Sequence, residues 1–348
     1  MVDMQAVMAA LATVKDPEIH RDLVSLNMVK NVRVEDSKVS LTVELTTPAC
    51  PLRESIDRDV RAALAQVPGV KEVDIQMSAN VRSAGVTLPD NLIPGIKNTV
   101  AVASGKGGVG KSTVSVNLAV ALAMTGARVG LLDADIYGPN VPLMMGVNEQ
   151  PQVTEDSKIH PIESYGVKIM SMGFLLKEDQ PVIWRGPMLH GVLKQFLGDV
   201  LWGDLDYLVV DLPPGTGDVQ LTLSQSIPLT CTVIVTTPQD VSLLDARKCM
   251  AMFKQFKVPI FGIIENMSYY VCPDCGRRDE IFSHGGGARA AERLGLPFLG
   301  EIPLATPVRV GGDTGAPIVL AKSPTPASEA FKEVAGRLAA TISVRAFK

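Results

Sequence analysis

A glycine-rich loop with two lysines is the stretch of this sequence whose residue types indicate chemistry most directly. It reads Gly-Lys-Gly-Gly-Val-Gly-Lys-Ser-Thr and occupies residues 105–113. In the pattern G-x-x-x-x-G-K-[ST], backbone N–H groups surround the phosphates of a nucleoside triphosphate, the lysine binds the β and γ oxygens, and the hydroxyl ligates Mg²⁺. Lys111 and Ser112 stand at these two places. The loop therefore predicts a site for a nucleoside triphosphate and Mg²⁺.

The same loop also matches the dinucleotide pattern G-x-G-x-x-G, through Gly105, Gly107 and Gly110. An acid, Asp133, follows after somewhat more than about 20 residues, as that kind of site requires. A dinucleotide loop has no use for a lysine and a hydroxyl at the last two places, so the triphosphate interpretation is favoured. The residues expected to contact the nucleotide in this loop are Gly105, Lys106, Gly107, Gly108, Val109, Gly110, Lys111, Ser112 and Thr113.

Strands that end in carboxylates follow the loop. The apolar run 207–212 carries Asp211, which suits a Walker B role in holding Mg²⁺ through water. The apolar run 129–133 ends in Asp133, and Asp135 follows it. Ligands of open α/β sheets bind beyond the carboxyl ends of the parallel strands. We therefore expect these acids to lie beside the phosphates.

A pair of cysteines forms the second constellation with a specific chemical meaning. Cys272 and Cys275, followed by a glycine, place two thiolates side by side, as in zinc knuckles, iron–sulfur ligation and redox dithiols. A zinc or [4Fe–4S] site needs about four ligands. Because Cys231 and Cys249 fall in predicted core elements, the missing pair is expected from a second copy of the chain. Completion of a local zinc site by His284 is the lower-ranked alternative.

The composition sets limits on the fold and the partners. A length of 348 residues predicts about two domains, and the net charge of −4 gives no bulk electrostatic case for nucleic acid. No segment is apolar for the length of a bilayer, and the N-terminus lacks the basic region of a signal peptide. The five cysteines do not form a disulfide framework. We expect a cytoplasmic protein that binds neither nucleic acid nor membrane.

Periodicity predicts the domain organisation. Residues 1–80 alternate helical and strand patterns and form a small α+β domain. Residues 81–98 are rich in proline, glycine and asparagine and read as a linker. Residues 99–348 are expected to form an α/β P-loop domain, with a mostly parallel sheet flanked by helices. In the small domain, Cys50 precedes a helix; a lowered pKa and a reactive thiolate, or a packed apolar role, are both open.

Several of these motifs together resemble one family over nearly the whole chain. The Lys-Gly-Gly-Val-Gly-Lys-Ser form resembles the deviant Walker A group of P-loop ATPases, which includes nitrogenase iron protein, MinD/ParA ATPases and the Mrp family. The sequences Asp-Leu-Pro-Pro-Gly-Thr-Gly-Asp at 211–218 and Cys-Pro-Asp-Cys-Gly at 272–276 are similar to Mrp/ApbC-type iron–sulfur cluster carrier ATPases. Asp16-Pro17-Glu18, with Cys50, resembles the small domain of iron–sulfur assembly proteins.

The resemblance implies roles for particular residues. Lys106 would reach the partner's nucleotide across a homodimer, Asp135 would orient the attacking water, and Asn266 would bond the adenine of ATP. Cys272 and Cys275 of two subunits would hold a bridging [4Fe–4S] cluster. The implied function is a carrier that hydrolyses ATP, receives clusters from the assembly machinery and delivers them to apo iron–sulfur proteins.

Two other functions remain open at this stage. One is a MinD/ParA-like positioning ATPase, which acts as a nucleotide switch on a membrane or DNA. Such a protein would use a C-terminal amphipathic helix for membrane binding, but residues 327–342 have few basic side chains and are expected to pack on the domain. The other is an ATPase whose cysteines hold a structural zinc ion at the dimer seam.

Overall fold

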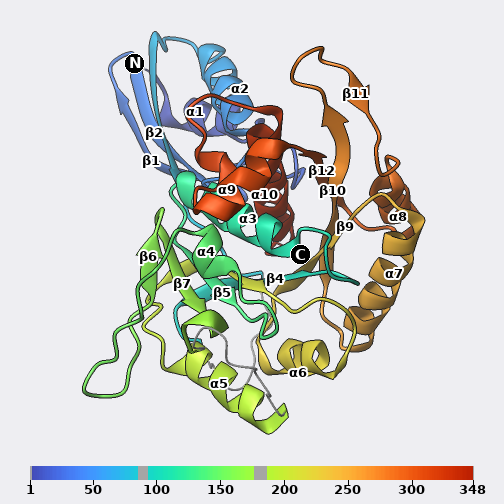
Figure 1. The fold of residues 1–348 in the computed structure, drawn as a ribbon. Coiled ribbons are helices and arrows are strands. Elements are labelled where there is room, and N and C mark those ends of the chain that lie inside the picture. The colour runs from blue at the N-terminus through green and yellow to red at the C-terminus, as the bar shows by residue number, and fades with distance from the viewer. Residues whose placement is uncertain (1, 85–92, 176–185, 348) are drawn as a thin grey trace. The chain divides into compact units, whose positions relative to one another are not determined.

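The structure is a computed structural model that describes residues 2–84, 93–175 and 186–347 (Figure 1). The chain divides into two compact units. One comprises Met1–Ala84 with Ala339–Lys348, and the other comprises Gly85–Leu338. Residues 85–92 of the predicted linker lie outside the described residues. Strand β4 begins at Ile96, which is inside the predicted linker range of 81–98.

The first unit is a three-stranded sheet with helices. Its elements are α1 (Met4–Leu11), β1 (Val29–Glu35), β2 (Lys38–Leu45), α2 (Arg53–Ala65) and β3 (Glu72–Ala79). The strand order is β1-β2-β3, with β1 antiparallel and β3 parallel to β2. Alternate residues of β2 are buried, as period-two patterning predicts. Ile56, Val60 and Leu64 of α2 lie one turn apart and are buried in the same hydrophobic cluster as these strand residues.

The second unit is an α/β fold, as the sequence predicts. Its elements are β4 (Ile96–Ala103), α3 (Lys111–Met124), β5 (Val129–Asp133), α4 (Val141–Met144), β6 (Ile162–Ser164), β7 (Val167–Ser171), a 3₁₀ turn (Met172–Leu175), α5 (Gly186–Gly198), β8 (Leu205–Asp211), α6 (Asp218–Ser226), β9 (Cys231–Thr236), α7 (Asp240–Gln255), β10 (Ile260–Val271), β11 (Arg278–Asp279), α8 (Gly286–Leu294), β12 (Phe298–Leu304), α9 (Thr306–Thr314), a 3₁₀ turn (Ile318–Leu320) and the first part of α10 (Pro326–Arg345), a helix whose residues from Ala339 onward belong to the first unit.

Among the described residues of this unit, one nine-stranded sheet has the order β11-β10-β9-β4-β8-β5-β7-β6, and β12 pairs with β10. All pairs are parallel except those made by the two end strands of this order, β11 and β6. Figure 1 shows helices on both sides of the sheet, with α3 and α9 on one side and α7 and α8 on the other. The expected sheet, mostly parallel and flanked by helices, is confirmed.

The central strands explain how the acids come together. Strands β8 and β9 are buried at every residue, because helices cover both faces of a parallel sheet and select continuous runs of valine, isoleucine and leucine. In the register of the sheet, Asp211 of β8 lies opposite Val102 of β4 on one side and Asp133 of β5 on the other. The carboxyl ends of these strands therefore lie in line where the glycine loop leaves β4.

Strand β10 is longer than the sequence pattern indicates. The apolar run predicts an end near Asn266, but the strand continues to Val271 and then pairs with β11. Met267 has a φ of +55°, and the pairing with β12 shifts register between Asn266 and Tyr270. This irregularity lets the strand change direction without ending. It carries the cysteine pair on a hairpin.

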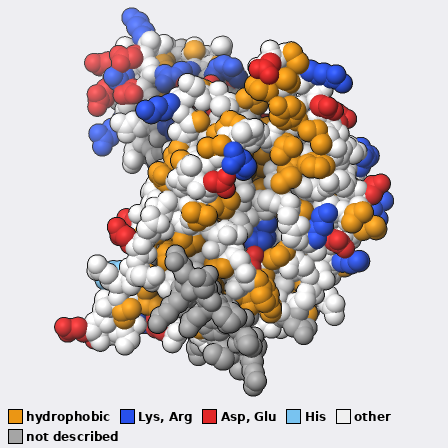
Figure 2. Space-filling model, viewed as in Figure 1, with side chains coloured by type: hydrophobic (Ala, Val, Ile, Leu, Met, Phe, Trp, Pro, Cys, Tyr) orange, Lys and Arg blue, Asp and Glu red, His pale blue; other side chains and the backbone are white. Residues whose placement is uncertain are grey.

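Helix α10 packs as expected. Phe331, Val334, Leu338 and Ile342 are each at most 1% exposed, which confirms the core interpretation of this amphipathic helix. In the described part of the chain, no helix has the length and apolar character needed to cross a bilayer. On the face shown in Figure 2, basic and acidic side chains are interspersed, in line with the small net charge.

Candidate nucleotide site and cysteine hairpin

The glycine loop joins β4 to the N-terminus of α3, and two of its glycines are required by the packing. A Cβ on Gly105 would lie 2.2 Å from the backbone of Asp245 in α7. Gly110 has a φ of +79°, in the left-handed region, and a Cβ there would lie 2.3 Å from Nδ2 of Asn266. The loop is thus held tightly between α7 and β10. Its backbone N–H groups lead into a helix N-terminus, which is a favourable place for phosphate.

Lys111, the first residue of α3, lies among the predicted acids. Its Nζ atom is 2.8 Å from Oδ2 of Asp211 and 3.6 Å from Oδ2 of Asp135. It is also 3.3 Å from Oγ of Ser112. Lys111 is only 6% exposed, so this ion pairing takes place with little water. The structure brings Lys111, Ser112, Asp135 and Asp211 together at one point.

The side chain of Asp211 is held by two serines. Oγ of Ser112 donates to Oδ2 and Oγ of Ser115 donates to Oδ1, each at 2.6 Å. Hydroxyl and carboxylate oxygens are the ligands that Mg²⁺ prefers, so Ser112 and Asp211 fit a magnesium site. The sequence analysis missed Ser115. Its position one helical turn after Lys111 is the signal that could have found it, since that spacing places both on one face of α3.

The two acids around the end of β5 have different environments. Asp133 is fully buried and accepts hydrogen bonds from Oγ of Ser171 at 2.8 Å and from the backbone N–H of Asp135 at 3.1 Å. It also accepts from the N–H of Val141 at 3.3 Å. Burial, together with the nearby charge of Asp211, raises the pKa of Asp133 to about 7. Asp133 therefore organises the loop after β5.

Asp135, in contrast, lines a cavity beside the loop. Its Oδ1 accepts from the N–H of Tyr137 at 3.2 Å, while Oδ2 faces Lys111. Burial raises the pKa of Asp135. A carboxylate that is anchored on one oxygen and faces the lysine with the other is well placed to orient a water molecule near a γ-phosphate.

The cavity has a volume of about 470 Å³, within the range of small-molecule sites. Lys106 and Asn266 also line it. The Nδ2 atom of Asn266 donates to the carbonyl of Val109 at 2.9 Å, so in this structure the side chain supports the glycine loop. The wall opposite the loop comes from residues that the sequence analysis did not select: Pro303, Leu304, Ala305, Val308, Arg309 and Asp313. Pro303 and Leu304 are the last residues of β12, Ala305 follows that strand, and the other three lie on α9.

The cysteine pair lies on the turn between β10 and β11. Cys272 donates its N–H to the carbonyl of Arg277, and its own carbonyl accepts from Gly276, both at 2.9 Å. The N–H groups of Cys275 and Asp274 point at the sulfur of Cys272, and with the thiol of Cys275 they lower the pKa of Cys272. Cys275 is exposed. The structure thus places two accessible thiols side by side, one of them disposed to ionise.

The other cysteines are separated from this pair by their burial. Cys231 and Cys249 are completely buried, which confirms their assignment to the core. Burial raises the pKa of Cys249 to about 12 and that of Cys50 to about 11. Of the two roles left open for Cys50, the structure favours the packed one, because desolvation outweighs the effect of the helix terminus on the pKa of this thiol.

The histidine considered as a local zinc ligand contacts other groups. His284 clusters with Glu265 and Glu301, the one set of metal-ligand side chains within 4.8 Å of one another in the described ranges. This set contains neither thiol. The local zinc alternative finds no support in this geometry.

Thiol alkylation provides a direct check of these environments. In metal-free protein near pH 8, iodoacetamide should label Cys272 and Cys275 first. For Cys50, a pKa raised from 9.0 to about 11 lowers the fraction of the thiol that is ionised by about 100-fold. Its labelling should therefore be slower by a similar factor. Cys231 and Cys249 should react only after unfolding. Peptide mass spectrometry over time measures the order, and early labelling of Cys50 would contradict the assignment of its environment.

A phosphate loop at the end of the first strand of a parallel sheet, with lysine, serine and aspartate at its mouth, defines a P-loop NTPase. The chain belongs to the NUBPL iron-transfer P-loop NTPase family, whose model matches residues 95–339. Residues 4–75 match a second model, described as iron–sulfur cluster assembly protein.

Individual relatives support this assignment. The chain is 54% identical over 342 residues to a protein of Deinococcus radiodurans named iron–sulfur cluster carrier protein, and the match covers 98% of this chain and 96% of that one. It resembles the structure of a nucleotide-binding protein of Archaeoglobus fulgidus in complex with ADP, with cobalt found in it, at 40% identity and a TM-score of 0.57. That match covers 63% of this chain and 87% of the other. The cell division ATPase MinD of Pyrococcus furiosus shares the fold, with a TM-score of 0.54 at 24% identity over 69% of this chain and 97% of MinD.

Proposed function

We propose that this protein is an iron–sulfur cluster carrier that binds and hydrolyses ATP. The observation that carries the proposal is the presence, in one chain, of a complete phosphate site and of an exposed thiol pair that supplies only half of a ligand set. The similarity along 98% of the chain to a protein named as a carrier supports it. The family match to iron-transfer NTPases points to the same function.

In the nucleotide site, the glycine loop and Lys111 bind the phosphates of ATP. Ser112 and Asp211 would hold Mg²⁺, which would neutralise negative charge on the phosphates. Asp135 orients the attacking water, and Lys106 extends toward the nucleotide of a partner subunit. We assign the bond to the adenine to Asn266, which lines the cavity. The similar protein from Archaeoglobus fulgidus was solved in complex with ADP, which supports the proposal that this site binds a nucleotide.

The cargo site is completed by dimerisation. Cys272 and Cys275 supply two thiolates, and the same two cysteines of a second copy supply the others, so that a [4Fe–4S] cluster bridges the dimer. Apo iron–sulfur proteins are the recipients, and the assembly machinery is the donor. The five cysteines are all free. Free thiols suit a reducing compartment, and we place the protein in the cytoplasm.

Transfer of the cluster is the activity to test. Anaerobically reconstituted protein, mixed with an apo ferredoxin, should lose its visible absorption as the ferredoxin gains its own spectrum and its electron-transfer activity. Free iron and sulfide at equal concentration are the control, in the presence of a chelator that intercepts released iron. Transfer no faster than in this control would contradict the carrier function. Binding of the dimer to liposomes or DNA only with ATP would instead indicate a positioning ATPase.

Asp135 has a role that can be separated from nucleotide binding. The Asp135→Asn variant keeps the size of the side chain but loses the negative oxygen that would orient water. We expect kcat for ATP hydrolysis to fall by about 100-fold or more, with the Kd for ATP changed by less than about threefold. A fluorescent ATP analogue and a phosphate-release assay measure the two quantities. An unchanged kcat would remove Asp135 from the mechanism.

A further inference from the structure

We propose that His284 is a positioning residue that couples the phosphate loop to the cysteine hairpin, by exchanging one hydrogen bond between Arg278 and Glu301. This inference rests on the proposed function only in taking Cys272 and Cys275 as the working groups. It concerns a network of polar side chains on β10, β11, β12 and the start of α8.

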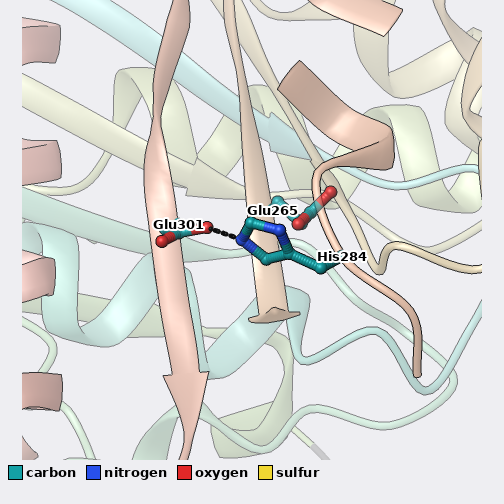
Figure 3. A group of neighbouring side chains, drawn as sticks. All are labelled: Glu265, His284 and Glu301. Atoms are coloured by element: carbon teal, nitrogen blue, oxygen red, sulfur yellow. Dashed lines mark hydrogen bonds and ion pairs between the residues drawn. The ribbon is translucent and has the colours of Figure 1, made fainter. Parts of the chain in front are cut away.

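The position of His284 gives one nitrogen atom two partners. Its Nε2 atom is 2.6 Å from Oε2 of Glu301, a contact drawn as a dashed line in Figure 3, and 2.7 Å from a guanidinium nitrogen of Arg278. A ring nitrogen that carries a proton can donate to the carboxylate, and one without a proton can accept from the arginine, but it cannot do both. Nε2 of His284 can therefore bond either Arg278 on β11 or Glu301 on β12, but not both at the same time.

Ser268 presents a second choice of the same kind. Its single hydroxyl proton faces two carboxylates, Oε1 of Glu265 at 2.7 Å and Oε2 of Glu301 at 3.0 Å. When the hydroxyl donates to Glu265, Oε2 of Glu301 is left to the proton of His284. When it donates to Glu301, His284 has to share that oxygen, which weakens the bond from His284 and favours acceptance from Arg278, although the oxygen has two lone pairs. The two choices therefore bias each other without excluding each other, and the network favours two arrangements.

One end of the network reaches the phosphate loop. Glu265 is buried and accepts from the N–H groups of Gly285 and Gly287, which fixes it to the start of α8. The next residue, Asn266, bonds the loop through the carbonyl of Val109. The side chain of Asn266 is packed against Gly110 without free space. Movement of the loop around a nucleotide therefore displaces β10 at the residue beside Glu265 and Ser268.

The other end reaches the cysteines. Arg278 is the first residue of β11, three positions after Cys275, and it stacks on the ring of Tyr269 with 3.8 Å between the guanidinium carbon and the ring centre. Its ion pair with Glu301 is long, at 3.6 Å. The bond to His284 is thus shorter than this ion pair, and it decides how firmly the hairpin is held against the sheet. Loss or gain of that bond changes the freedom of Cys272 and Cys275.

The same three side chains, Glu265, His284 and Glu301, resemble a metal site in composition. The guanidinium of Arg278 lies where a cation would approach Nε2 of His284, and Glu265 is occupied by backbone donors. A hydrogen-bonded switch fits these contacts better than a bound ion does.

The test measures thiol alkylation with and without nucleotide. Metal-free protein is labelled with iodoacetamide in the absence and presence of Mg²⁺ and a non-hydrolysable ATP analogue. Labelling is done at a dilution at which light scattering gives a monomer in both states, and mass spectrometry assigns the label to Cys272 or Cys275. In the wild type, the nucleotide should change the labelling rate by about fivefold or more, the scale of a typical coupling between sites.

The variants separate coupling from folding. His284→Ala and Glu301→Gln should bind the analogue within about twofold of the wild-type Kd, but lose the nucleotide effect on labelling. Arg277→Ala is the matched control, since it removes a positive charge from the neighbouring residue, whose side chain takes part in none of these contacts. It should respond as the wild type does. Arg278→Lys, which keeps the charge but not the planar stacking, should reduce the response.

A nucleotide effect of wild-type size in His284→Ala would overturn the proposal, and so would a wild type whose labelling ignores bound nucleotide. Neither result depends on iron. If the protein fails to bind a cluster, the proposed carrier function is contradicted. The comparison of labelling rates with and without nucleotide still shows whether the two sites are coupled.

Discussion

Replacement of Lys111 by alanine should weaken ATP binding by about 10- to 100-fold, because the lysine makes charge-assisted bonds that are each worth roughly 1.5–3 kcal/mol. It should also destabilise the nucleotide-free protein. In the structure, Lys111 is the cation paired with the buried Asp211 and with Asp135. Removal of one partner of a buried pair leaves an uncompensated charge and lowers the free energy of unfolding by about 3–5 kcal/mol. Calorimetric titration with ATP and urea unfolding measure the two effects.

Lys106→Ala is the matched control for this prediction. It removes the other lysine of the same loop, whose side chain makes none of these ion pairs, so stability should change by less than about 0.5 kcal/mol. Because the proposed mechanism extends this lysine toward the partner's nucleotide, ATP hydrolysis should still fall. Added Mg²⁺ should restore part of the stability of Lys111→Ala by binding near Asp211. Equal stability of the two variants would contradict the pairing seen at Lys111.

Cys272→Ala should abolish cluster binding while leaving nucleotide binding intact. The variant removes two of four thiolates from a dimer, because each subunit loses one, and a [4Fe–4S] cluster held by two cysteines is not retained. After anaerobic reconstitution and desalting, iron and sulfide should fall to background. ATP affinity should stay within about twofold of the wild type, since the hairpin lines no part of the nucleotide cavity.

Cys50→Ala provides the comparison for the cysteine prediction. Cys50 is half-buried with a raised pKa, so its removal should leave the iron content unchanged. Full iron content in Cys272→Ala, or loss of iron in Cys50→Ala, would show that the cluster is bound at another place in the chain.

Much of the nucleotide site was predictable because its spacing is local. The glycine loop places Lys111 and Ser112 on the first turn of a helix whatever the rest of the chain does. Parallel strands bring Asp211 and the acids after β5 to one edge of the sheet. These are consequences of periodicity and topology, which are visible in the sequence.

The remainder depends on contacts between segments far apart in sequence. The distinction between Asp133, which is buried, and Asp135, which faces the cavity, is set by Ser171 and by the loop after β5. Likewise, the pKa of Cys50 depends on burial by residues that a helix-terminus argument does not include. The network of His284 joins three strands and a helix, so no local pattern could have indicated it. The apolar run predicted where β10 begins. It did not predict that the strand continues to Val271, because the chain changes direction at Met267.

The most direct test of the central claim is anaerobic reconstitution of the full chain with iron and sulfide, followed by metal analysis and light scattering on one sample. The account predicts a coloured dimer, with twice the chain mass of 37.1 kDa and about two irons per chain, and with no colour in Cys272→Ala. A colourless monomer, or a dimer that holds zinc and takes up no iron, would contradict it.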